Sequence, residues 1–228
     1  MNADVRRRIE MGTRVRDFCR AHPSDDPGYA TLLGRLEDRL TRADALASQE
    51  RAGRIAELWA AARREDLRRD MHFQLLRHLV RIGELAARDN PELAGKFRLR
   101  NQNSTHKSFL IATKAMLAEG LVNKEMFVKL GLSQTMLDEL SKAVVDFEGA
   151  TEMGNIGRVD HVGARADLAT VSLEVVEVVE LLNTFNSFRF RDAPDLAAAW
   201  DSVRNVPTPG RRPKQTGGEQ PSAGIPPA

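Results

Sequence analysis

The sequence predicts an all-α protein, and three observations support this fold class. Charged residues make up 29% of the chain and aromatic residues only 5%, a composition typical of long helices rather than sheets. Apolar residues recur at spacings of three and four along most of the chain. No proline lies between Pro27 and Pro91. We therefore predict an antiparallel up-down bundle of about four helices, with a protruding N-terminal helical hairpin and a disordered C-terminal tail.

The first predicted helix covers about residues 3–21. His22-Pro23 ends it, because the residue before a proline avoids the α region. Asp26 is the predicted N-cap of the next helix, with Pro27 at its first position. One face of the first helix is apolar or small: Val5, Ile9, Gly12, Val15 and Cys19.

The longest predicted helix runs from Pro27 to about Asp89, roughly 90 Å at about 1.5 Å per residue. Its apolar stripe changes phase twice. We interpret these changes as changes of packing partner, and a bend near Gly53 or Ala60 is the alternative. The first stripe is Tyr29, Leu33, Leu36, Leu40, Ala43 and Ala47, the second Ile55, Trp59 and Ala62, and the third Met71, Leu75, Leu79, Ile82 and Ala86.

Shorter helices follow a polar connector at about 90–104. One is predicted over 105–130 with Gly131 as its C-cap, and Ser133 caps the next. We interpret Gly154-Asn155-Ile156-Gly157 as a turn, and one helix from Ser133 to Phe185 is the alternative. After a helix over about 158–188, a last short helix is predicted over about 192–203. These elements predict a hairpin region at 1–58, a bundle at 59–206 and a disordered Pro/Gly-rich tail at 207–228.

Composition and charge exclude several classes of protein. Cys19 is the only cysteine, so no intrachain disulfide can form. The charged N-terminus does not resemble a signal peptide, and no apolar run reaches membrane-spanning length. We predict a cytoplasmic protein that does not bind a membrane. The net charge of +2 is uneven, because residues 1–100 hold 21 Lys and Arg against 16 Asp and Glu.

No catalytic or metal-ligand motif is found, so we predict a protein that is not an enzyme and binds no metal or cofactor. His72 and His78 are six residues apart, on different sides of a helix, and no Glu-x-x-His sequence occurs. His106 and His161 each precede an apolar stripe by one turn and can meet at one end of the bundle. We favour two half-exposed histidines at helix starts, and a deep pocket holding both would favour an enzyme.

Arginines cluster in the middle of the long helix. Arg63, Arg64, Arg68 and Arg69 are candidate anion-binding residues, since Arg64 and Arg68 repel each other at a spacing of four. Glu65, Asp66 and Asp70 interleave with them, and Glu65 can pair with Arg69. A solvated, salt-bridged face is therefore the favoured interpretation.

Two segments resemble uncharacterised bacterial proteins of similar length, which have an Arg-rich start and a Pro/Gly-rich end. They are His161-Val162-Gly163-Ala164-Arg165-Ala166-Asp167-Leu168 and the stretch from Arg189-Phe190-Arg191-Asp192-Ala193-Pro194 to Trp200. The resemblance implies a bacterial origin and a shared helical fold. It implies no activity and no functional residue.

The leading functional hypothesis is a non-enzymatic helical scaffold or protein–protein interaction module. Its N-terminal hairpin would bind a partner helix or a second copy, since only one short helix is expected to cover the apolar stripe there. A homo-oligomer is therefore predicted. The alternative is a nucleic-acid or anionic-surface binding protein that uses the arginine cluster. The candidate partner-binding residues are Leu33, Leu36, Leu40 and Ala43.

Overall fold

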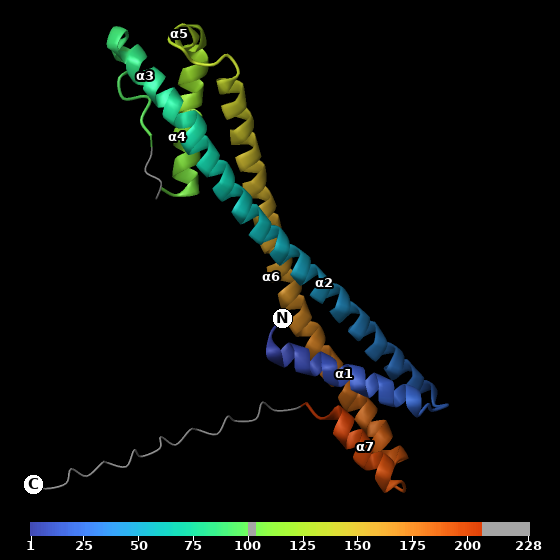
Figure 1. Ribbon diagram of the computed structural model, residues 1–228. Helices are drawn as coiled ribbons and strands as arrows, with labels where there is room; N and C mark the ends of the chain where they lie inside the picture. The colour runs from blue at the N-terminus through green and yellow to red at the C-terminus, as the bar shows by residue number, and fades with distance from the viewer. Residues whose placement is uncertain (100–103, 207–228) are drawn as a thin grey trace, which may run out of the picture. The chain divides into compact units, whose positions relative to one another are not determined.

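The computed structural model describes residues 1–99 and 104–206, and all of its regular elements in these ranges are helices (Figure 1). The predicted all-α class is confirmed, whereas the predicted tail lies outside the described residues. The α-helices are α1 (Ala3–Ala21), α2 (Pro27–Asp70), α3 (Arg77–Asp89), α4 (His106–Val122), α5 (Lys124–Lys129), α6 (Met136–Arg189) and α7 (Pro194–Arg204).

The first two helices begin where the sequence predicts. Helix α1 has the predicted bounds, and the side chain of Asn2 accepts a hydrogen bond from the backbone of Asp4 at its start. The carboxylate of Asp26 accepts hydrogen bonds from the backbone N–H groups of Gly28 and Tyr29, at 2.7 and 3.1 Å. Asp26 is thus confirmed as an N-cap, which satisfies N–H groups that have no partner within the helix.

The chain from Pro27 to Asp89 is helical throughout, as predicted, but it contains a π-helical segment, η1 (Met71–Leu76). Each hydrogen bond of a π-helix spans five residues, so one extra residue enters the turn. That residue shifts the phase of every side chain that follows. The third apolar stripe in the sequence starts at Met71, which is the first residue of this segment.

The turn predicted at Gly154–Gly157 is wrong, because α6 runs without interruption from Met136 to Arg189. Both glycines are buried within the helix and face α2. Two of the four predicted bundle segments are therefore parts of one helix. The predicted N-cap at Ser133 is also wrong, since α6 begins at Met136 and Ser133 lies outside the helix.

The helix predicted over 105–130 is divided at Asn123. The side chain of Asn123 donates a hydrogen bond to the backbone carbonyl of Glu119 at 2.9 Å, which satisfies the end of α4. Asparagine competes with the helical backbone in this way because its side chain can form local hydrogen bonds. Gly131 has φ +101° just after α5, which confirms its predicted role as a C-cap.

Contacts gather in two compact units. The first unit contains Asp38–Glu174 with Met1. Its main core is formed by the end of α2, η1, α3, α4, α5 and the beginning of α6. Phe97, from the segment after α3, is buried against Gly83, where a Cβ atom would lie 2.3 Å from the ring. The domain boundary predicted at residue 58 stays a prediction.

Among the described residues, the second unit contains Asn2–Glu37 and 175–206. Trp200 of α7 is 2% exposed, and its ring centroid lies 5.5 Å from that of Phe18 in α1. The indole N–H of Trp200 donates to the side-chain oxygen of Asn183 at 2.8 Å. Tyr29 of α2 packs edge-on against Phe185 of α6. This unit therefore has an aromatic core, although the chain contains few aromatic residues.

A buried polar group in this unit leads to a test by pH. Burial raises the pKa of Tyr29 to about 12, and the neighbouring Cys19 thiol adds to the shift. The folded state holds the hydroxyl proton of Tyr29 more tightly than the unfolded state does. The contribution of this group to folding stability is therefore complete below about pH 10 and is lost as the pH rises toward about 12. Tyr29 is the only tyrosine. Absorbance titration should therefore show that tyrosinate forms at a higher pH in the native protein than in urea. Ionisation at the same pH in both conditions would contradict the burial of Tyr29.

Candidate interaction surfaces

Helices α2 and α6 approach each other closely at two glycines of the first unit. A Cβ atom on Gly53 would lie 2.8 Å from the carbonyl oxygen of Gly157, and one on Gly157 would lie 2.8 Å from the carbonyl oxygen of Gly53. Two helical turns further along α2, Ala60 contacts Gly154. The small residues allow the two backbones to touch. The contacts also set the register of the two helices along their axes.

The direction of the two helices follows from the same contacts. Moving forward along α2 from Gly53 to Ala60 means moving backward along α6 from Gly157 to Gly154, so the helices are antiparallel. Figure 1 shows the two helices crossing near the middle of their lengths. Between the contacts, the carboxylate of Glu57 lies 3.3 Å from Nδ1 of His161. We call residues 51–63 and 153–165 the two-helix segment.

The contact residues divide this segment into two sides. An α-helix turns by about 100° per residue, so the residue after a contact residue points to one side and the residue before it to the other. Because the helices are antiparallel and face each other, the residues that follow contacts in both helices share one side. The residues that precede contacts share the opposite side.

The side formed by the preceding residues carries three large apolar side chains, beside the charged Arg63 and Asp160. Trp59 precedes Ala60, Met153 precedes Gly154, and Ile156 precedes Gly157. Their side chains are 54%, 49% and 55% exposed, respectively. Small residues continue this surface at Ala52 and Gly163. We call this surface the apolar side, and exposed rings and branched chains in one place are typical of a protein interface.

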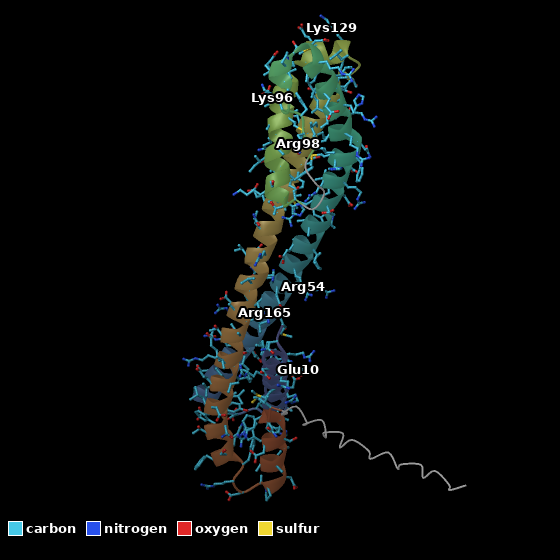
Figure 2. All side chains as sticks on the ribbon, turned by 90° about the vertical axis from the view of Figure 1, so that its left-hand side faces the viewer. Glu10, Arg54, Lys96, Arg98, Lys129 and Arg165 are labelled. Atoms are coloured by element: carbon cyan, nitrogen blue, oxygen red, sulfur yellow. The ribbon has the colours of Figure 1, made fainter. Side chains whose placement is uncertain are left out.

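The side formed by the following residues is basic. Arg54 follows Gly53, Arg158 follows Gly157, and Arg165 follows the buried Ala164, while Arg51 lies one turn before Arg54. All four arginines are exposed, and none forms an ion pair with another residue that the structure describes. Figure 2 labels Arg54 on α2 and Arg165 on α6 in neighbouring parts of the helix pair. We call this surface the basic side.

Two acidic residues lie within one helical turn of Arg54 on α2. Glu50 binds the N-terminal ammonium group of Met1 at 2.6 Å, and Glu57 lies against His161. Two aliphatic side chains lie among the arginines. Leu58 follows Glu57 and is 62% exposed, and Val162 follows His161 and is 53% exposed. The basic side therefore combines four cations with an apolar centre.

The predicted partner-binding stripe lies mainly in the interior. Leu36, Leu40 and Ala43 are buried within the chain, and Leu33 is half-buried. A substitution at Leu36 therefore acts on folding before it acts on any partner. Helix α6 packs beside this stripe, as the contact between Tyr29 and Phe185 shows, so the stripe has more cover than the single short helix that was expected.

The four predicted anion-binding arginines do not share a surface. Arg63 is exposed, whereas Arg64 is half-buried beside Gly154. Arg69 pairs with Asp66 at 3.2 Å rather than with the predicted Glu65. Arg68 is buried, lies 5.0 Å from the centroid of the Phe109 ring and donates a hydrogen bond to the hydroxyl of Ser104, which places it inside the bundle.

The two histidines considered for catalysis have different neighbours. His106 lies 3.4 Å from the guanidinium group of Arg68, and its pKa is lowered by burial and by the charges of Arg68 and Arg64. His161 lies beside Glu57 instead. Within the described parts of the chain, no three His, Cys, Asp or Glu residues are grouped so that they could hold a metal ion.

The sequence pattern indicated part of the apolar side and none of the basic side. It recognised Ile55 and Trp59 as a new apolar face, but it did not align them with Met153 and Ile156. The missing signal was the pair of glycines at 53 and 157, each within a helical apolar pattern, where glycine often marks a close approach of two backbones.

Comparisons with protein-family models, curated proteins and solved structures found no match. The predicted resemblance to a bacterial family therefore stays a prediction. No helix among residues 1–99 and 104–206 is both long enough and apolar enough to cross a membrane. These findings describe an all-helical protein without a recognised family.

Proposed function

We propose that this protein is a non-enzymatic helical scaffold that self-associates through the apolar side of its two-helix segment. The exposure of Trp59, Met153 and Ile156 on one side of two touching helices supports this proposal. Two helices bury only the surfaces that face each other, whereas four helices enclose a core. A second copy would complete such a core.

Burial of the three side chains would supply substantial free energy. Complete burial of a large apolar side chain contributes about 1.5–3 kcal/mol before the cost of association is included. Ala52 and Gly163 add little bulk, so the second helix pair can approach closely. The geometry of a coiled-coil or four-helix interface requires this combination of large and small residues.

Charge also favours a second copy on this side. The charged residues that precede or flank the contacts there are of both signs, such as Arg63 and Asp160. Identical surfaces can therefore meet without strong repulsion. A twofold axis parallel to the helix pair would place α2 of one copy over α6 of the other, so that every neighbouring helix is antiparallel.

Light scattering during size-exclusion chromatography tests the proposal. We expect the unaltered protein to dimerise and Trp59→Asp with Ile156→Asp to be monomeric, with dimerisation weakened at least tenfold, because a carboxylate would be buried without a partner. Leu181→Asp is the matched control, since Leu181 is 50% exposed and lies outside the two-helix segment. A monomeric unaltered protein, or a dimer that both aspartates leave intact, would refute the proposal.

The alternative function, a nucleic-acid surface at Arg63, Arg64, Arg68 and Arg69, has weaker support. Binding of a nucleic acid needs several cations that contact its phosphate backbone at the same time. Arg68 is buried in the bundle and Arg69 already has Asp66 as a partner. An anionic partner is better supported at the basic side of the two-helix segment.

A further inference from the structure

We propose that the basic side binds an acidic amphipathic helix of another protein. The surface is formed by Arg51, Arg54, Arg158 and Arg165 around Leu58 and Val162. It points away from the apolar side, so this binding does not require self-association. The protein would then join copies of itself on one side and hold a different, acidic partner on the other.

The four arginines are brought together by the close helix contact. Arg54 and Arg158 directly follow the two glycines that touch, so they lie at the same level of the pair and on the same side. Arg158 and Arg165 are two turns apart on α6, about 10 Å along the helix axis. Like charges at this density repel one another, and carboxylates between them would remove that repulsion.

Arginine is suited to carboxylates because its planar guanidinium group can donate two parallel hydrogen bonds to both oxygens. All four cations of the basic side are arginines. A second copy of the same surface is excluded as the occupant, because eight arginines would then face one another. The partner must therefore carry acidic groups.

Leu58 and Val162 distinguish a protein partner from a nucleic acid. Both side chains project among the arginines and remain more than half exposed. A phosphate backbone offers no apolar surface to cover them. An amphipathic helix does, when it carries apolar residues at spacings of three and four with glutamates beside them. The length of the surface corresponds to about three turns of such a helix.

Fluorescence anisotropy tests this proposal with a labelled synthetic helix that carries leucine stripes flanked by glutamate. The protein used is Trp59→Asp with Ile156→Asp, so that failure of binding cannot result from failure of self-association. We expect the peptide to bind and its affinity to fall as salt rises. Arg54→Glu with Arg158→Glu should weaken binding at least tenfold, and Leu58→Ser should weaken it at unchanged charge.

The matched control is Arg35→Glu with Arg81→Glu, which changes the net charge equally at exposed arginines outside the two-helix segment. This control should bind as tightly as the parent protein. A second peptide with lysine in place of glutamate should bind the Arg54→Glu with Arg158→Glu protein more tightly than it binds the parent. That exchange of preference separates a specific charge contact from loss of folding.

Two results would overturn the proposal. One is absence of peptide binding at low salt while circular dichroism shows the protein folded. The other is tighter binding of a DNA or RNA duplex than of the acidic peptide, weakened by the arginine reversals and unaffected by Leu58→Ser. The latter result would assign the basic side to nucleic acid.

Discussion

Replacing Gly157 by leucine is expected to lower the free energy of unfolding by about 3 kcal/mol, because the new side chain would overpack the helix contact. A Cβ atom there would lie 2.8 Å from the carbonyl oxygen of Gly53 and 2.9 Å from the backbone nitrogen of Glu57. Backbone atoms cannot move aside as a flexible side chain can. The helices would have to separate, and their flanking contacts would weaken. Urea denaturation followed by circular dichroism measures the change.

Gly149→Ala is the matched control on the same helix. A Cβ atom on Gly149 meets nothing within 4 Å. Alanine favours the helical backbone over glycine by about 0.5–1 kcal/mol, so this variant should be slightly more stable than the unaltered protein. If Gly157→Leu is as stable as Gly149→Ala, then α2 and α6 do not touch at Gly157, and the two sides defined from that contact lose their basis.

The helices could be predicted from the sequence because their apolar stripes are local signals. The bounds of α1, the N-cap at Asp26 and the helical stretch from Pro27 to Asp89 depend on residues within a few turns of each other. The phase change at Met71 was also visible, although periodicity alone cannot distinguish a change of partner from the extra residue of a π-helix.

The role of Gly154 and Gly157 could not be predicted from residues within a few turns of them. Glycines separated by three residues favour a turn when the chain is considered alone, and favour close packing when another helix lies against them. Only the position of Gly53, about a hundred residues earlier, decides between the two. The predicted turn divided α6 and added a helix to the bundle for this reason.

The candidate surfaces were missed for a related reason. The predicted arginine cluster is contiguous in sequence, whereas the basic side joins Arg54 with Arg158 from distant helices. The apolar stripe at Leu36 and Leu40 was predicted to bind a partner because the sequence pattern did not indicate that α6 packs against it. Exposure depends on every helix that packs against a residue, and residue spacing does not specify the number of those helices.

Replacing Trp200 by alanine is expected to destabilise the second unit by about 3–5 kcal/mol, the usual cost of removing a buried aromatic side chain. Trp200 contacts the Phe18 ring and donates a hydrogen bond to Asn183. The protein provides a local probe of this change, because Cys19 is the only cysteine, is adjacent to Phe18 in the chain and is buried. Alkylation of Cys19 should therefore become much faster in Trp200→Ala.

Two further variants show whether the aromatic core itself is responsible. Trp200→Phe keeps a ring and loses the indole N–H, so its cost should be nearer to the roughly 1 kcal/mol of one hydrogen bond plus a small cavity. Leu181→Ala truncates a side chain of the same unit that is 50% exposed and lies outside the two-helix segment, and it should change stability by less than about 0.5 kcal/mol. Unchanged protection of Cys19 in Trp200→Ala would mean that α7 does not close this core. The thiol would then be buried by α1 and its other neighbours alone, and the aromatic contacts of Trp200 would contribute little to folding.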